Sequence, residues 1–198
     1  MSRPVIGYHV IFGAYGFWLP NDPRGSQSRY VFAPRLAAFG PPQKLRDDTT
    51  LTPADAAQLR AMQSELELPP VRFHPAQIAA IAEGFGQIVG RLGLVFYAAA
   101  LMPDHVHIVA ARQEMHAEDI AAYLKRAGSR QLSQAGLHPF AGHVRRGGRL
   151  PSPWGEHGWK IFLFDLDEIE HAARYVSGNP TEAGLPAQSW PWVKEFEG

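Results

Sequence analysis

The sequence contains no cysteine among its 198 residues, which excludes disulfide bonds and thiolate metal ligands. No apolar run approaches the roughly 20 residues that a membrane-spanning helix needs. The first residues, Met1–Tyr8, also lack the long apolar stretch of a secretory signal peptide. These absences predict a cytoplasmic protein with no membrane partner.

The formal net charge is zero, because 19 Lys and Arg residues balance 19 Asp and Glu residues. The distribution is uneven, since residues 125–149 contain no acid and carry the basic residues Lys125, Arg126, Arg130, Arg145, Arg146 and Arg149. A cationic stretch in a neutral protein suits a polyanion that touches one face, so these residues are candidate phosphate contacts. A solvated loop and helix surface is the alternative.

The length and the 45% content of hydrophobic residues predict one globular domain. Apolar patterning predicts strands over residues 4–13 and 159–164 and two more within 94–112, with helices over about 53–66, 75–92, 117–134 and 166–178. The last helix is expected to end at Asn179, because proline disfavours helix in the residue before it. This order predicts an α+β fold, an antiparallel sheet with helices on its faces.

Two histidines open the second strand within 94–112. Side chains of a strand alternate between its faces, so His105 and His107 point to one side. Two neighbouring imidazoles form half of a metal site. The alternative is an ordinary pair of hydrogen-bonded strand histidines.

The last helix carries a tyrosine outside its apolar stripe. Tyr175 falls roughly 140° from the centre of that stripe on a helical wheel, and Asn179 follows one turn later. The stripe consists of Leu166, Ile169, Ala173 and Val176. Together with His105 and His107, the Asn179 oxygen would suit Mg²⁺ or Mn²⁺, and Tyr175 would attack a phosphorus atom. The alternative is a surface tyrosine with Asn179 as helix cap.

Two segments resemble a known family. Leu101–Val109 resembles the His–hydrophobic–His (HUH) signature of single-tyrosine transposases. Arg174–Leu185 is similar to the nucleophile segment of REP-associated tyrosine transposases, in which a tyrosine is followed after three residues by Asn-Pro and then by a small-glycine-apolar finish. The two motifs occur in the right order with a basic helix between them.

The resemblance implies a bacterial, DNA-associated enzyme with a ferredoxin-like antiparallel sheet flanked by helices. Such enzymes cut and rejoin single-stranded DNA, often beside hairpins, with a divalent metal and a covalent 5′-phosphotyrosine. Carried onto this chain, His105, His107 and Asn179 would hold Mg²⁺ or Mn²⁺, and Tyr175 would be the nucleophile. Residues 1–198 would form a single catalytic domain with an insertion at about 14–70. A homodimer and a monomer are both compatible with the family.

Several alternatives stay open at this point. Tyr8, Tyr15, Tyr30, Tyr97 and Tyr123 are rival nucleophiles, with Tyr123 on the basic helix the strongest. Besides a strand-transfer enzyme, the chain could be a non-catalytic binder of hairpin DNA with the same fold. A metal hydrolase of small phosphoesters is the third hypothesis, although it would not need the cationic stretch.

Overall fold

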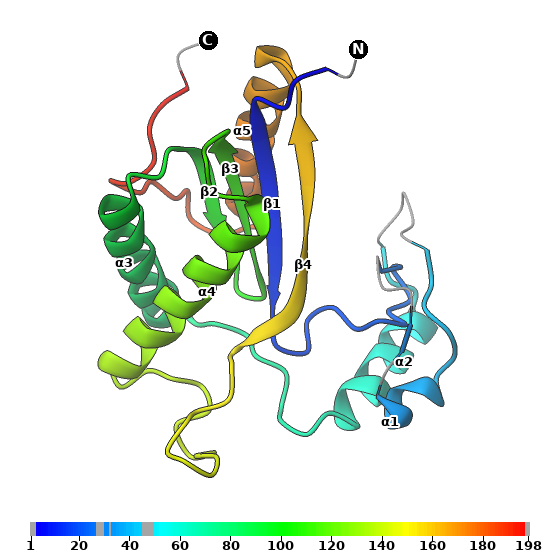
Figure 1. Cartoon of the computed structure of the whole chain (residues 1–198). Coiled ribbons are helices and arrows are strands. Elements are labelled where there is room, and N and C mark those ends of the chain that lie inside the picture. The colour runs from blue at the N-terminus through cyan, green and yellow to red at the C-terminus, as the bar shows by residue number, and fades with distance from the viewer. Residues whose placement is uncertain (1–2, 27–29, 32, 45–49, 197–198) are drawn as a thin grey trace.

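The computed structural model describes residues 3–26, 30–31, 33–44 and 50–196. Figure 1 shows a sheet with helices on its two faces and a smaller lobe beside one end of it. The elements in chain order are β1 (Gly7–Ala14), α1 (Pro34–Ala37), α2 (Pro53–Ser64), α3 (Pro75–Leu92), β2 (Phe96–Leu101), β3 (His105–Ala111), α4 (Ala117–Gln134), β4 (Trp154–Leu163) and α5 (Leu166–Glu182).

The sheet is antiparallel, with strands in the order β2-β3-β1-β4. Leaving out the short helices of the lobe, the chain runs β1-α3-β2-β3-α4-β4 before α5. This is the β-α-β-β-α-β arrangement of a ferredoxin-like fold. The fold expected from the order of elements and from the resemblance is thus confirmed.

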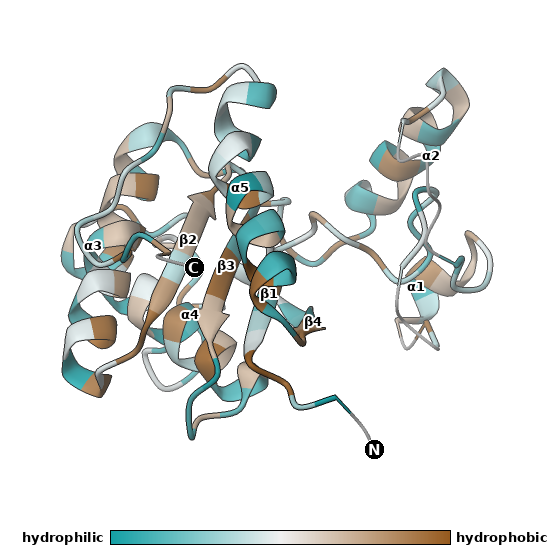
Figure 2. Ribbon diagram, turned by 90° about the horizontal axis from the view of Figure 1, so that it is seen from above, coloured by the Kyte–Doolittle hydropathy of each residue, from teal (hydrophilic) through white to brown (hydrophobic). Residues whose placement is uncertain are grey.

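Each strand of the sheet divides its side chains between two cores. Tyr8, Val10 and Phe12 of β1 belong to the core beneath α3 and α4. A second core, which includes Val109, Leu163, Ile169 and Val176, lies between the sheet and α5. Figure 2 shows predominantly hydrophobic strands between helices that carry the hydrophilic residues. Because side chains alternate, the odd-numbered residues His9 and Ile11 face the α5 side.

Local signals in the sequence account for the helix boundaries. Thr52 and Asp55 form a capping box at the start of α2, and Gly93 ends α3 with a φ of 63°. The predicted bounds of the helices over 75–92 and 117–134 agree with α3 and α4. The strand predicted over 159–164 begins earlier in the structure, where β4 starts at Trp154.

The end of the last helix was predicted wrongly. α5 continues to Glu182 with Pro180 inside it and buried. The residue that stops it is Gly184, two residues later, whose φ is 72°. The Leu185 N–H donates to the Pro180 carbonyl, and the Gly184 N–H donates to the Thr181 carbonyl. These two bonds form a Schellman motif, so one missing amide in the last turn is tolerated.

The predicted apolar stripe of this helix also needs a correction. Ile169, Ala172, Val176 and Pro180 are its buried residues, whereas Leu166 in the first turn is exposed. On a helical wheel the stripe therefore lies nearer Tyr175 than expected, although Tyr175 itself stays outside it.

Most of the described residues between β1 and α3 form the smaller lobe. Leu19, Leu36 and Met62 make a core of their own there, and Figures 1 and 2 both show α1 and α2 standing away from the sheet. The buried Asn21 amide donates to the Leu36 carbonyl and holds the loop to α1. The insertion predicted at about 14–70 covers this lobe, though residues 27–29, 32 and 45–49 of it lie outside the described residues.

The C-terminal segment lies along the outer edge of β2. The Gln188 side chain accepts a hydrogen bond from the Leu101 N–H and donates one to the Leu101 carbonyl. Nearer the other end of the strand, the Lys194 N–H donates to the Phe96 carbonyl. None of the helices in the described part of the chain is long and apolar enough to cross a bilayer.

Candidate active site

Three histidines gather on the α5 side of the sheet. In the register of β1 and β3, Ile11 lies opposite His107 and Gly13 lies opposite His105. His9 is therefore the diagonal neighbour of His107, a distance that aromatic side chains bridge. The His105 and His107 rings lie 4.8 Å apart between centroids, and the His9 and His107 rings 5.2 Å apart.

His9 holds the ring of His107 in place. The His9 Nε2 and His107 Nδ1 atoms share a buried hydrogen bond of 2.9 Å. Burial lowers the pKa of His9 to about 4. Burial, followed by the charges of His105 and His9, lowers the pKa of His107 to about 2. Both rings are therefore neutral at neutral pH, and the Nε2 atom of His107 is left for another partner.

Asp104 and Phe17 hold the second imidazole. The His105 Nδ1 atom lies 2.7 Å from the Asp104 carboxylate, so its Nε2 atom is the one left for a ligand. Arg72 pairs with the same carboxylate at 2.7 Å. Burial raises the pKa of Asp104, but the hydrogen bond and charge of His105, with Arg72 and Arg24, outweigh it and place the pKa below its ordinary value. The Phe17 ring stacks on His105 with centroids 5.0 Å apart.

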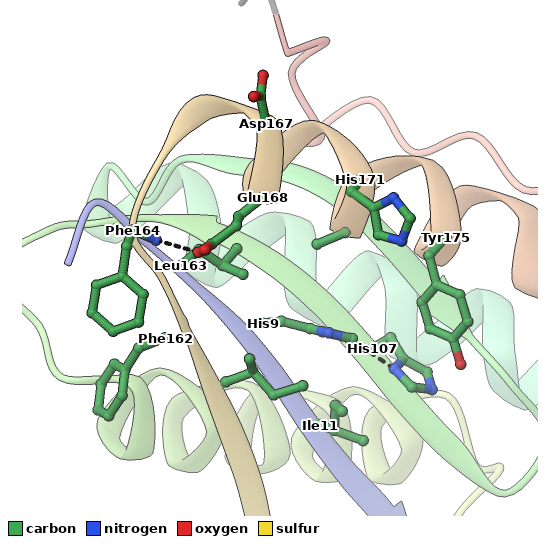
Figure 3. A pocket seen from close by; sticks show the side chains of 12 residues that line it. His9, Ile11, His107, Phe162, Leu163, Phe164, Asp167, Glu168, His171 and Tyr175 are labelled. Atoms are coloured by element: carbon green, nitrogen blue, oxygen red, sulfur yellow. Dashed lines mark hydrogen bonds between the residues drawn. The ribbon is translucent and has the colours of Figure 1, made fainter. Parts of the chain in front are cut away.

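Tyr175 comes to this histidine cluster from α5. Its ring centroid lies 6.0 Å from that of His107 and 6.2 Å from that of His9. The side chain is 50% exposed, and its hydroxyl makes no hydrogen bond with a described residue. Figure 3 shows Tyr175 and His171 on successive turns of α5 above His9 and His107. These four residues line a cavity of about 750 Å³ with Ile161, Phe162 and Leu163 of β4.

The donor atoms present fit a divalent cation with open coordination positions. Both Nε2 atoms are free while both Nδ1 atoms are engaged, the arrangement by which neighbouring groups orient metal-binding histidines. Within the described residues, no group of three or more His, Asp or Glu side chains could hold a metal. A cation at His105 and His107 would therefore need further oxygen ligands, as Mg²⁺ and Mn²⁺ commonly do. Asn179 lies one turn beyond Tyr175, half-buried, and its side chain has no hydrogen bond to a described residue.

Comparison with known proteins finds distant matches among solved structures. No family model and no curated protein matches the sequence.

Two solved structures resemble this chain. One is a REP-associated tyrosine transposase bound to a REP hairpin, with 10% identity, a TM-score of 0.46, and coverage of 94% of this chain and 73% of the other. The second is a candidate transposase from Deinococcus radiodurans R1, with 15% identity, a TM-score of 0.39, and coverage of 94% and 95%. The functional proposal therefore depends on the residues of the site.

The basic residues are not gathered at this site. Arg126 and Arg130 are exposed on α4, which lies on the opposite face of the sheet from α5. Lys125 is held within the protein, because its Nζ atom donates to the Gly155 carbonyl at 2.9 Å and lies over the Phe12 ring. Burial lowers the pKa of Lys125 to about 8, partly offset by Glu156. A phosphate contact by Lys125 stays a prediction, and its placement favours a structural role.

The basic loop between α4 and β4, residues 135–153, lies at the end of the sheet where β3 begins (Figure 1). Arg145, Arg146 and Arg149 are exposed there. Arg145 lies 3.6 Å from Glu67, a contact between this loop and the segment after α2. All three side chains are accessible to a polyanion that approaches this end of the molecule.

Four of the five rival tyrosines are placed less favourably. Tyr123 lies on α4, packs against the core on the far side of the sheet and has the Arg126 guanidinium over its ring. Tyr8 is buried, and Tyr15 and Tyr97 pack edge to face on Phe140 and Phe196. Trp154 is buried in the core, whereas Trp159 is half-buried against Trp18.

Two residues around the histidines, Phe17 and His171, were missed from the sequence. His9 on the first strand could be expected near the pair, but its hydrogen bond to His107 depends on strand register. Phe17 comes from a loop whose path no periodicity predicts. His171 lies four residues before Tyr175, a helical spacing that the sequence does show.

Proposed function

We propose that the protein is a metal-dependent enzyme that nicks and rejoins single-stranded DNA near hairpins through a covalent 5′-phosphotyrosine on Tyr175. The observation that supports this most strongly is the placement of Tyr175 beside His107, 6.0 Å between ring centroids. The two motifs are 68 residues apart in sequence, counted from His107 to Tyr175. Packing of α5 on the sheet joins them on one face.

The roles of the individual side chains follow from their surroundings. His105 and His107 would hold Mg²⁺ or Mn²⁺ through their free Nε2 atoms, with Asn179 as a further oxygen ligand. A cation held there supplies Lewis-acid polarisation of a phosphoryl oxygen and fixes the phosphate in position. His9, Asp104 and Phe17 keep the two imidazoles in that orientation. Tyr175, half-exposed at the cavity, is accessible to a DNA phosphate.

Covalent catalysis accounts for joining without an external energy source. The Tyr175 hydroxyl oxygen attacks the phosphorus atom, and the bond from phosphorus to the 3′ oxygen of the DNA breaks. The phosphotyrosine retains the phosphodiester, so a 3′ hydroxyl can later reverse the reaction. Arg126, Arg130, Arg145, Arg146 and Arg149 are candidate contacts to the flanking DNA backbone.

The test is detection of a protein–DNA adduct that survives denaturation. A labelled single-stranded hairpin oligonucleotide is incubated with the native chain and Mg²⁺ or Mn²⁺. We expect an adduct with the native chain and with Tyr123→Phe as matched control, and none with Tyr175→Phe or with chelator. An adduct that persists in Tyr175→Phe would contradict the assignment of the nucleophile.

Other outcomes separate the competing functions. Tight binding of hairpin DNA without an adduct on any single-stranded substrate would favour the non-catalytic binder. Turnover of small phosphoesters without an adduct would favour a hydrolase. The histidine cluster and the accessible tyrosine together favour the enzyme over the binder, because a binder needs neither.

A further inference from the structure

α5 presents a polar side chain at every fourth residue on the side of Tyr175. Asp167, His171, Tyr175 and Asn179 follow one another at this spacing, which places neighbours about 5–6 Å apart between Cβ atoms. The first three line the cavity that also contains His9 and His107. Figure 3 shows His171 on the turn before Tyr175, with both rings directed to the same side of the helix.

The proposed reaction requires a proton acceptor for this tyrosine. A tyrosine hydroxyl ordinarily ionises near about pH 10, so at neutral pH it is protonated and a weak nucleophile. Its proton must leave as the bond to phosphorus forms. A base within reach, with a pKa near neutrality, accelerates such a step by about 10²–10⁴-fold.

The other titratable groups that face the cavity already have hydrogen-bond partners or lie farther than one turn of α5 from Tyr175. His9 and His107 share their buried hydrogen bond. Glu168 accepts from the Phe164 N–H at 2.7 Å and lies 3.4 Å from Arg3. Asp167 is two turns from Tyr175. β4 and the residue that follows it contribute only apolar side chains to the cavity, namely Ile161, Phe162, Leu163 and Phe164.

His171 meets the remaining requirements. It is exposed to solvent, and its ring makes no hydrogen bond with a described residue. It is one helical turn from the hydroxyl-bearing side chain. Its unprotonated nitrogen is therefore available to accept a proton, and the ring can exchange that proton with water.

We propose that His171 is the general base and acid for Tyr175, an assignment that rests on the function proposed above. In cleavage, the Tyr175 O–H bond breaks and its proton passes to a nitrogen of His171, while the tyrosine oxygen bonds to phosphorus. The 3′ oxygen of the DNA leaves and takes a proton from water. In joining, a 3′ hydroxyl attacks the phosphorus and gives its proton to water, and the tyrosine oxygen regains its proton from the His171 imidazolium.

The test measures the single-turnover rate of adduct formation for His171→Ala and His171→Gln. We expect that rate to fall by about 10²–10³-fold at about pH 7.5. The affinity for the hairpin oligonucleotide should stay within about threefold, because the site's binding groups are unchanged. Glu170→Gln, on the same helix and paired with Arg174 at its surface, is the matched control and should keep the native rate.

Two further measurements distinguish proton transfer from a structural effect. Added imidazole should restore the rate of His171→Ala but leave Tyr175→Phe inactive. The native rate should not depend on the concentration of imidazole buffer, whereas the rate of the alanine variant should rise with it. Native rates in both His171 variants would overturn this inference alone. A native chain that forms no adduct at all would overturn the proposed function with it.

Discussion

Acidification should destabilise the protein through the buried His9–His107 pair. Burial holds the pKa of His9 at about 4, and burial with the neighbouring imidazole charges holds that of His107 at about 2. An unfolded histidine titrates near about pH 6.5. As pH falls from about 6.5 to about 4, the unfolded chain therefore takes up protons that the folded chain does not bind, and the free energy of unfolding decreases.

The expected loss is large enough to measure. One unit of pKa difference corresponds to about 1.4 kcal/mol. Between about pH 7 and about pH 5, the free energy of unfolding should fall by about 2 kcal/mol through His9 alone and by up to about 4 kcal/mol through the pair. Whole domains are stable by only about 5–15 kcal/mol. The pKa of Asp104 is also lowered, but a carboxylate of this kind loses its contribution only below about pH 4, outside this interval.

Urea unfolding curves in the presence of chelator, recorded between about pH 7 and about pH 5, test this reasoning. His9→Asn keeps a side-chain amide beside His107 and removes one titrating ring, so the slope of unfolding free energy against pH should drop to about half. His157→Asn replaces a ring that is 80% exposed and should keep the native slope. A native slope in His9→Asn would refute the claim that the buried pair causes the acid sensitivity.

Three other predictions concern the cation, the fold and DNA. Asp104→Asn should weaken Mn²⁺ binding by about 10–100-fold in calorimetry, since it removes the carboxylate that orients His105, and unchanged affinity would contradict that role. Gly184→Ala should lower the free energy of unfolding by about 1–2 kcal/mol and the melting temperature by several degrees. The cause is the backbone φ of 72°, because the space around Gly184 is open and an added Cβ would meet no neighbour. Arg126→Ala should reduce the salt dependence of hairpin binding by about one counterion, whereas Lys125→Ala should not; equal effects of both variants would refute the structural placement of Lys125.

Much of the fold could be predicted because its signals are local. α3 begins at a proline in its first turn and ends at Gly93, and both signals depend only on a few neighbouring residues. The placement of His105 and His107 on one face of the sheet follows from strand alternation alone. Tyr175 was recognisable because a tyrosine on the polar side of an amphipathic helix has no packing role there.

The missed features depend on tertiary contacts or on competing local signals. The bond from His9 to His107 requires the register of β1 on β3, which no single strand specifies. The role of Lys125 depends on β4 bringing the Gly155 carbonyl beneath α4. At the end of α5, the rule that proline stops a helix competed with the Schellman bonds around Gly184, and the latter prevailed.

The segment along β2 has a consequence for how the molecule could assemble. The amide of Gln188 occupies the backbone donor and acceptor that Leu101 would offer to a fifth strand. Lateral extension of the sheet is thereby directed to β4, which has no neighbour on its outer side within the described part of the chain. Any companion strand, from another copy or a different protein, would then lie beside the exposed Ile161 and Phe162, at the mouth of the cavity that holds Tyr175.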